Sequence, residues 1–270
     1  MSSDQVAPFG ALVPDFELAF IVFSALMNAG CLIYGAILAK RMRSCLPLLV
    51  LPAGLVTVVV EATVAHLGHV WHPRVGQTEL YNSYGTSIPV YLAFVYSFYF
   101  GIAYLAALHA ASINVLTRRR LWTAAGFVAI GAFAMEIPVV QSGLWIYFGT
   151  QSLWFFKGSL PICWVLMNVS CVFFAATVLL MARSILVGWR QLCFLPMSPI
   201  AAYMGHIGSG FPFYLVANSS YASNPVAVQA SGIMTAINSV LIISFCIHLL
   251  TREFEGCHVC GSAEPPSGGA

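Results

Sequence analysis

Seven apolar segments, each close to the length of one membrane-crossing helix, divide the chain. Short polar loops separate them, and the expected ranges are 17–39, 45–70, 90–112, 121–140, 161–181, 195–216 and 226–250. A helix needs about 20 mainly apolar residues to cross the hydrocarbon core of a bilayer. The pattern therefore predicts an all-α fold, a polytopic bundle of seven transmembrane helices.

The composition supports a membrane domain rather than a soluble one. Hydrophobic residues make up 60% of the 270 and charged residues only 7%, whereas a soluble domain carries about 25% charged residues. We expect one membrane domain, residues 17–250, between a lumenal N-terminal segment, 1–16, and a disordered cytosolic tail, 251–270. The formal net charge of +2 and the lack of a long basic run speak against a nucleic-acid partner.

The basic residues predict the orientation of the bundle. If the loops after the first, third and fifth segments share one side with the tail, that side holds nine of the eleven: Lys40, Arg41, Arg43, Arg118, Arg119, Arg120, Arg183, Arg190 and Arg252. Basic loops stay in the cytosol, so the N-terminus is expected to be lumenal and the C-terminus cytosolic. We expect a multi-pass protein of the endoplasmic reticulum, glycosylated at the lumenal sequon that begins at Asn218.

Two acidic residues, Glu61 and Glu136, lie inside apolar segments. Counted from the cytosolic side, both fall about 23–24 Å along a core of about 30 Å. An acid at that depth is costly in hydrocarbon, so it should face the protein interior and is a functional-site candidate. Burial favours the neutral, protonated carboxyl, which can donate a proton that a second acid or a histidine takes back. We expect these two to be the catalytic residues; the alternative is that each only hydrogen-bonds a neighbour.

Aromatic and histidine side chains are expected to surround the two acids. Glu61, His69 and His72 should share one face of the helix over 45–70. The aromatic segment 141–160, which follows Pro138, is interpreted as a re-entrant or interfacial cap over the acids rather than a spanning helix. The candidate substrate-binding residues are His69, Tyr81, Trp145, Tyr147, Trp154 and His206.

Neither a metal nor a cofactor is expected. The pair Cys257 and Cys260 lacks the second pair of ligands that a zinc site needs. One alternative does use zinc: an intramembrane hydrolase of amide or ester lipids, in which His66, His69 or His72 binds the metal with His206, and Glu61 is the base. Histidines three residues apart without a clear third ligand are a weak signal for a metal site. A retinal protein is excluded because both lysines of the chain lie outside the apolar segments.

In size, helix number and few intramembrane acids, residues 17–250 resemble the integral-membrane terpene cyclases of fungal meroterpenoid pathways. The resemblance implies a metal-independent enzyme that protonates an epoxide or alkene of a hydrophobic prenylated small molecule and so starts its cyclisation. Aromatic faces would stabilise the travelling positive charge. The resemblance is architectural, so no catalytic residue is carried over by a matching motif. A sterol-isomerase-like enzyme and a lipid-binding protein stay open beside the zinc hydrolase.

Overall fold

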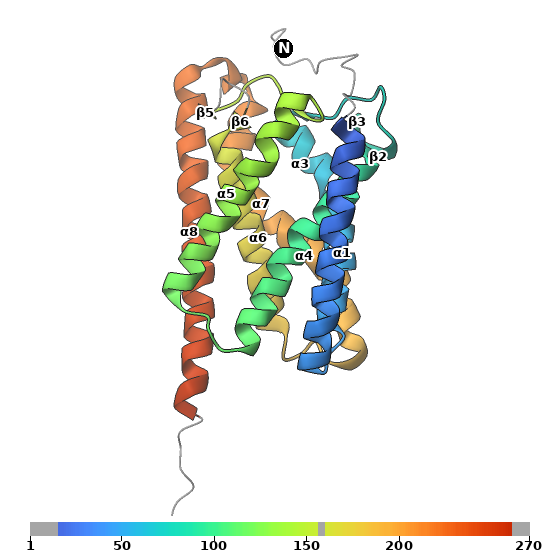
Figure 1. Cartoon of the computed structure of the whole chain (residues 1–270). Coiled ribbons are helices and arrows are strands. Elements are labelled where there is room, and N and C mark those ends of the chain that lie inside the picture. Colours follow the sequence, from blue (N-terminus) through green and yellow to red (C-terminus); the bar gives the residue numbers. More distant parts are fainter. Residues whose placement is uncertain (1–15, 156–159, 261–270) are drawn as a thin grey trace, which may run out of the picture.

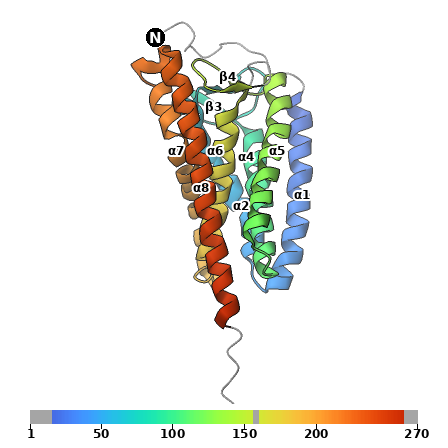
Figure 2. The same ribbon diagram turned by 90° about the vertical axis from the view of Figure 1, so that its left-hand side faces the viewer.

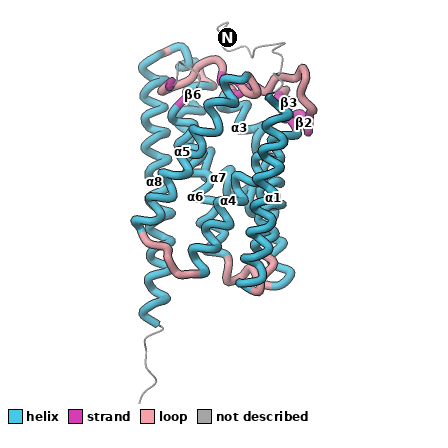
Figure 3. Tube along the Cα trace, viewed as in Figure 1, coloured by secondary structure: helices cyan, strands magenta, loops and turns pink. Residues whose placement is uncertain are grey.

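Long helices that run along one common axis make up almost all of the computed structural model, which describes residues 16–155 and 160–260 (Figure 1). Short strands and their loops gather at the end of the bundle where the first helix begins (Figure 3). The predicted all-α architecture is confirmed. The helices are α1 (Phe16–Met42), α2 (Leu46–Thr57), α3 (Glu61–Gly68), α4 (Val90–Ser112), α5 (Arg118–Ser142), α6 (Ile162–Ala182), α7 (Phe194–Ala217) and α8 (Pro225–Cys260).

Six membrane-length spans are found among the described residues. Their order is α1, the continuous run of α2 and α3, then α4, α5, α6 and α8. Each is long and apolar enough to cross a bilayer, and a multi-pass membrane protein is therefore supported. The predicted helix ends agree with the observed ones to within three residues, except at the C-terminal end of the last segment.

The seventh long helix, α7, is not one of the six spans. It contains Pro199 and Pro212 and packs against α2, α6 and α8, so that protein covers much of its surface (Figure 2). A Cβ added to Gly205 would lie 2.9 Å from the backbone of Cys171 on α6, which shows how closely the two helices approach. At its contacts with α6, α7 carries the small residues Gly205 and Gly210.

The second apolar segment ends earlier than predicted and is interrupted. A 3-10 turn, Val58–Val60, separates α2 from α3, and α3 ends at Gly68 because His69 takes a left-handed conformation with a φ of 54°. The prediction that His69 and His72 lie on the same helix face as Glu61 is therefore wrong. The chain reverses after Gly68, and this reversal, not helical spacing, sets where the two histidines lie.

Three two-stranded antiparallel sheets cover one end of the bundle. β1 (Val70–Trp71) pairs with β4 (Ile146–Tyr147), β2 (Glu79–Ser83) with β3 (Thr86–Pro89), and β5 (Trp154–Phe155) with β6 (Leu160–Pro161). In the first sheet Val70 faces Tyr147. As predicted, the described part of segment 141–160 does not form a spanning helix. It forms a cap over the helix ends.

At the opposite end, α8 continues ten residues past the predicted boundary. Residues 251–260, assigned to a disordered tail by the sequence analysis, extend the helix to Cys260. Phe254 explains part of this extension: its side chain is buried, and the Arg183 guanidinium lies 4.1 Å from the centre of its ring. Residues 261–270 and 1–15, which the predicted tail and N-terminal segment include, lie outside the described residues.

Candidate active site

A small polar cavity lies inside the bundle just below the strand cap, and we call it the inner cavity. Its volume is about 80 Å³, and α3, α4, α5, α6 and α7 all contribute to its wall. Its polar lining includes the side chains of Glu61, His72, Tyr96, Glu136, Asn168 and His206. Both intramembrane acids that the sequence singled out therefore reach one cavity.

Glu61 is the first residue of α3 and is buried. Its Oε1 lies 3.0 Å from Nε2 of His72, and its Oε2 accepts a hydrogen bond from the Tyr96 hydroxyl. Tyr81 supports the turn that precedes it, because its hydroxyl donates to the carbonyl oxygen of Val58 at 2.8 Å. Burial raises the pKa of Tyr81 to about 12, so this hydroxyl keeps its proton.

Glu136 lies on α5 and is only 2% exposed, although most of that helix faces outward. Its Oε2 accepts from the Tyr147 hydroxyl at 2.7 Å, and its Oε1 accepts from Nδ2 of Asn168 at 2.6 Å. Burial raises the pKa of the Tyr147 hydroxyl well above its ordinary value. The pairing of β4 with β1 holds Tyr147 over the cavity, so the strand cap supplies one partner of this acid.

His206 faces the same space from α7. Its Nδ1 lies 2.9 Å from the Tyr214 hydroxyl, while its Nε2 is buried without a hydrogen-bond partner among the described residues. Trp164 packs edge-on against the imidazole, with 5.2 Å between ring centroids. A buried polar atom without a partner is costly, so a ligand or a water molecule that bonds to Nε2 would be stabilising.

The structure brings together five of the eight predicted site residues: Glu61, Glu136, Trp145, Tyr147 and His206 all line the inner cavity. The other three lie elsewhere. Tyr81 holds the turn before α3, and His69 lines a second pocket. Trp154, on β5, is 40% exposed and does not line the inner cavity.

Tyr96, Asn168 and Trp164 were not predicted as site residues, although each contacts a cavity group. They lie on α4 and α6, and no sequence spacing relates them to the acids. Asn168 did carry a signal, since an amide inside an apolar segment needs a polar partner. For Tyr96 and Trp164 no comparable signal exists, because aromatic residues are common in such segments.

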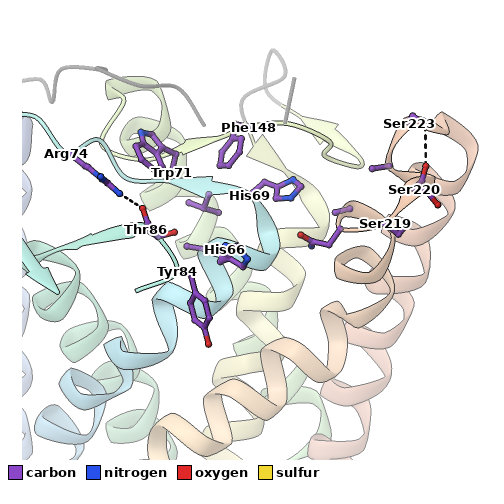
Figure 4. Close-up of a pocket in the computed structure, with 16 residues that line it drawn as sticks. His66, His69, Trp71, Arg74, Tyr84, Thr86, Phe148, Ser219, Ser220 and Ser223 are labelled. Atoms are coloured by element: carbon purple, nitrogen blue, oxygen red, sulfur yellow. Dashed lines mark hydrogen bonds between the residues drawn. The ribbon is translucent and has the colours of Figure 1, made fainter. Parts of the chain in front are cut away.

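A second and larger hollow, the outer pocket, opens at the capped end of the bundle (Figure 4). Its volume is about 760 Å³, and its lining includes His66, His69, Arg74 and Tyr84. His66 stacks on Tyr84, and His69 stacks on Phe148 with 5.4 Å between ring centroids. Burial lowers the pKa of His69, which favours its neutral form.

The inner cavity and the outer pocket meet at Val70, which lines both. Gly68, two residues before Val70, packs tightly against Trp164 of the inner cavity: a Cβ added to Gly68 would lie 2.1 Å from Cζ3 of Trp164. Gln151 donates from Nε2 to the Gly68 carbonyl oxygen at 2.7 Å. The residues beside the meeting point are therefore tightly packed.

The histidines of the zinc hypothesis are divided between these hollows. His66 and His69 line the outer pocket, whereas His72 and His206 line the inner cavity. Within residues 16–155 and 160–260, no group of three or more His, Cys, Asp or Glu side chains is arranged to hold a metal ion. The zinc-hydrolase alternative therefore has no ligand set in the described part of the chain.

The predicted glycosylation site has its amide nitrogen engaged. Nδ2 of Asn218 donates to the carbonyl oxygens of Leu67 and Tyr214, at 2.8 and 2.9 Å. An amide nitrogen carries two hydrogens, and a glycan replaces one of them. Attachment at Asn218 would therefore remove one of these two hydrogen bonds.

Comparison with known proteins finds no matching family model, no significantly similar curated protein and no significantly similar solved structure.

Proposed function

We propose that this protein is a membrane-embedded enzyme that transfers protons to and from a lipophilic substrate, with a terpene cyclase as the best-fitting class. The observation that carries the proposal is the presence of two buried carboxyl groups, Glu61 and Glu136, in the lining of one cavity. Trp145, Tyr147 and Trp164 line the same space. Acid–base pairs and aromatic faces are what a carbocation reaction requires.

The reaction is an isomerisation and needs no oxidant. One protonated carboxyl gives its proton to an epoxide oxygen or an alkene carbon of the prenylated substrate, and the epoxide C–O bond or the π bond breaks. A second alkene of the same molecule attacks the cation and closes a ring. The final cation loses a proton to the other carboxylate or to Nε2 of His206, which has no hydrogen-bond partner among the described residues. The proton count of the enzyme is restored once that proton returns to the first acid.

The two acids differ in how they exchange protons. Glu61 lies 3.0 Å from the His72 imidazole, so a proton can pass between the two side chains. The Glu136 partners are a hydroxyl and an amide, neither of which is a base at neutral pH. Glu61 and His72 therefore act as the relay, and Glu136 exchanges its proton only through the cavity.

We infer that α7 crosses the bilayer as well, which makes seven spans with a lumenal N-terminus and a cytosolic C-terminus. The loops at the uncapped end carry Lys40, Arg41, Arg118 and Arg183, and such loops face the cytosol. The strand cap and the outer pocket then face the lumen of a compartment such as the endoplasmic reticulum. The inner cavity lies under the cap, in the lumenal half of the membrane.

The test is turnover by Glu61→Gln and Glu136→Gln proteins in host microsomes, supplied with farnesylated aromatic epoxides and analysed for cyclised products of unchanged mass. Each glutamine keeps the size of the side chain but removes the acid. Loss of general acid–base catalysis costs about 10²- to 10⁴-fold in rate. Glu79→Gln is the matched control, because Glu79 lies on β2 and does not line the inner cavity. Wild-type turnover by both glutamine variants would overturn the proposal.

The same variants separate the remaining alternatives when they are also supplied with sterols and tested for lipid binding. A sterol-isomerase-like enzyme also depends on both acids, but it converts sterols and leaves the epoxides unchanged. A lipid-binding protein converts neither substrate, and both glutamine variants keep most of its affinity for the lipid.

A further inference from the structure

An apolar groove runs along the side of the bundle between α1 and α5, with α4 behind it and Val172 of α6 at its base. We call it the lateral groove; its volume is about 750 Å³. Phe20 and Phe98 lie buried in it, while Phe23 and Phe127 stand at its exposed edges. Figure 1 shows the helices that line the groove, the blue α1 and the green α5 with α4 between them.

The lateral groove meets the inner cavity at two residues. Tyr99 and Met135 line both hollows, so these two side chains alone are shared between the groove and the space that holds the acids. Pro138 lines the groove one helical half-turn beyond Glu136, and the Glu136 side chain faces the cavity. α5 therefore presents one surface to each hollow.

The hydroxyl of Tyr99 is the polar group at this junction. It is buried and has no hydrogen-bond partner among the described residues. Leaving such a group unpaired costs free energy, and a hydrogen-bond acceptor at the junction would remove that cost. The groove beyond it offers a nearly hydrocarbon surface, so the site combines a long apolar part with one hydroxyl donor at its inner end.

The two volumes show why the groove is needed. The inner cavity, at about 80 Å³, holds a reacting group but not a whole prenylated molecule. The groove, at about 750 Å³, falls within the usual range of about 300–1,000 Å³ for small-molecule sites. A ligand with its polar or epoxide end in the cavity and its chain in the groove would fill both.

We propose that the lateral groove binds the branched, unsaturated hydrocarbon chain of a single prenylated ligand, which enters from the bilayer between α1 and α5 and places its polar end past Tyr99. The ligand class rests on the proposed function, whereas the binding position rests on the groove itself. The aromatic lining suits such a chain, because its double bonds pack against ring faces. Entry from the side also fits a ligand that is dissolved in the membrane.

The experiment uses a farnesyl ether that carries a benzophenone at its polar end, added to the purified full-length protein in lipid nanodiscs. Illumination should attach the probe near the junction, and mass spectrometry of the peptides should place the label on α4 or α5. Farnesol should compete with this labelling, and dodecanol, a saturated chain of equal length, should compete at least about tenfold less well.

Gly131→Trp fills the groove and is compared with Gly126→Trp. Both glycines are exposed on α5, and a Cβ added to either meets no atom within 4 Å, so neither change strains the fold. Only Gly131 lines the groove. Gly131→Trp should lower labelling at least about tenfold, while Gly126→Trp should label like the wild-type protein.

Tyr99→Phe tests the junction. Because the Tyr99 hydroxyl has no hydrogen-bond partner among the described residues, weaker binding of the probe to this variant would mean that a contact with the probe itself was lost. The affinity for the probe should fall about fivefold, as expected for one hydrogen bond.

Three outcomes would overturn the inference. The first is equal labelling of the two tryptophan variants, and the second is equal competition by farnesol and dodecanol, which would mean that any acyl chain fills the groove. The third is a change of oligomeric state in Gly131→Trp with labelling unchanged, which would make the groove a contact between copies of this chain. Labelling does not require turnover, so Glu136→Gln should still be labelled. A failed cyclase assay with labelling intact would reject the chemistry alone.

Discussion

The inner cavity and the outer pocket meet at Val70 and differ in size by almost tenfold, at about 80 and 760 Å³. The larger hollow has histidines that stack on aromatic rings near its surface. The smaller one holds two carboxyl groups, each with two hydrogen-bond partners from other parts of the chain.

Under the proposed function, the smaller of the two hollows, and not the larger one, holds the reacting groups. Burying a carboxyl group is costly unless hydrogen bonds compensate it, so the protein uses four side chains from four separate elements to hold two acids. Such an arrangement is expensive to build and is expected where it serves a function. The outer pocket needs no comparable network, because none of its described lining residues carries a carboxyl group.

The largest expected effect comes from disturbing the packing of Gly68 on Trp164, beside the inner cavity. In Gly68→Ala the new methyl group would lie 2.1 Å from Trp164, so that the ring must turn. Trp164 packs against Tyr147 and His206, and we expect a loss of about 3 kcal/mol in stability, the upper part of the usual range for overpacking. Thermal unfolding in detergent, followed by tryptophan fluorescence, measures it.

Gly126→Ala is the control for Gly68→Ala, because its new methyl group meets no atom within 4 Å. It should leave the melting temperature unchanged or slightly raised, since alanine favours a helix over glycine. Equal melting temperatures for the two alanine variants would show that the contact between Gly68 and Trp164 relaxes at little cost, and would contradict the prediction.

A smaller effect is expected when one tyrosine hydroxyl is removed from each region. Tyr147→Phe takes a donor from the buried Glu136 and should cost about 1–2 kcal/mol, together with a loss of turnover. Tyr84→Phe changes an exposed residue of the outer pocket, and its effect should stay within about 0.5 kcal/mol. The same unfolding experiment compares them. If Tyr84→Phe were the more costly change, the contrast between the regions would be reversed.

The smallest effect concerns pH and belongs to the outer pocket. Because burial lowers the pKa of His69, the unfolded chain binds a proton more readily than the folded one, and stability falls as pH drops below about 6.5. His69→Asn should reduce this dependence, measured as melting temperature between pH 7.5 and 5.5. Asparagine tolerates the left-handed conformation at this position better than most residues.

His66→Asn is the matched change in the same pocket and should leave the pH dependence in place. The dependence would be assigned to the wrong imidazole if His66→Asn removed it and His69→Asn did not.

Local physics made the helices predictable. A run of about 20 apolar residues has few alternatives to a helix in a membrane, because every backbone polar group must be paired within the segment. α4, which spans Val90–Ser112, was predicted at its observed ends. The depth of Glu61 and Glu136 follows from the same counting, and this is why the sequence pointed to both acids.

The partners of the acids could not be predicted in the same way. His72 reaches Glu61 because α3 stops at Gly68 and His69 turns the chain back with a positive φ. Residues other than glycine adopt a positive φ in only a few per cent of cases, so the spacing suggested a continuous helix face instead. Trp154 shows the converse error: its aromatic neighbourhood in the sequence suggested a site, but its strand places it at the surface.

By itself, then, the sequence determined the class of the protein, its helices and the two acids at matching depth, because these depend on the length and polarity of single segments. Only the tertiary structure decided that Tyr96, Tyr147 and Asn168 hold the acids. It also placed His66 and His69 in a different hollow from the acids and opened a groove between α1 and α5. Those features depend on how side chains from different segments pack, and packing is a property of pairs of helices that no single segment specifies.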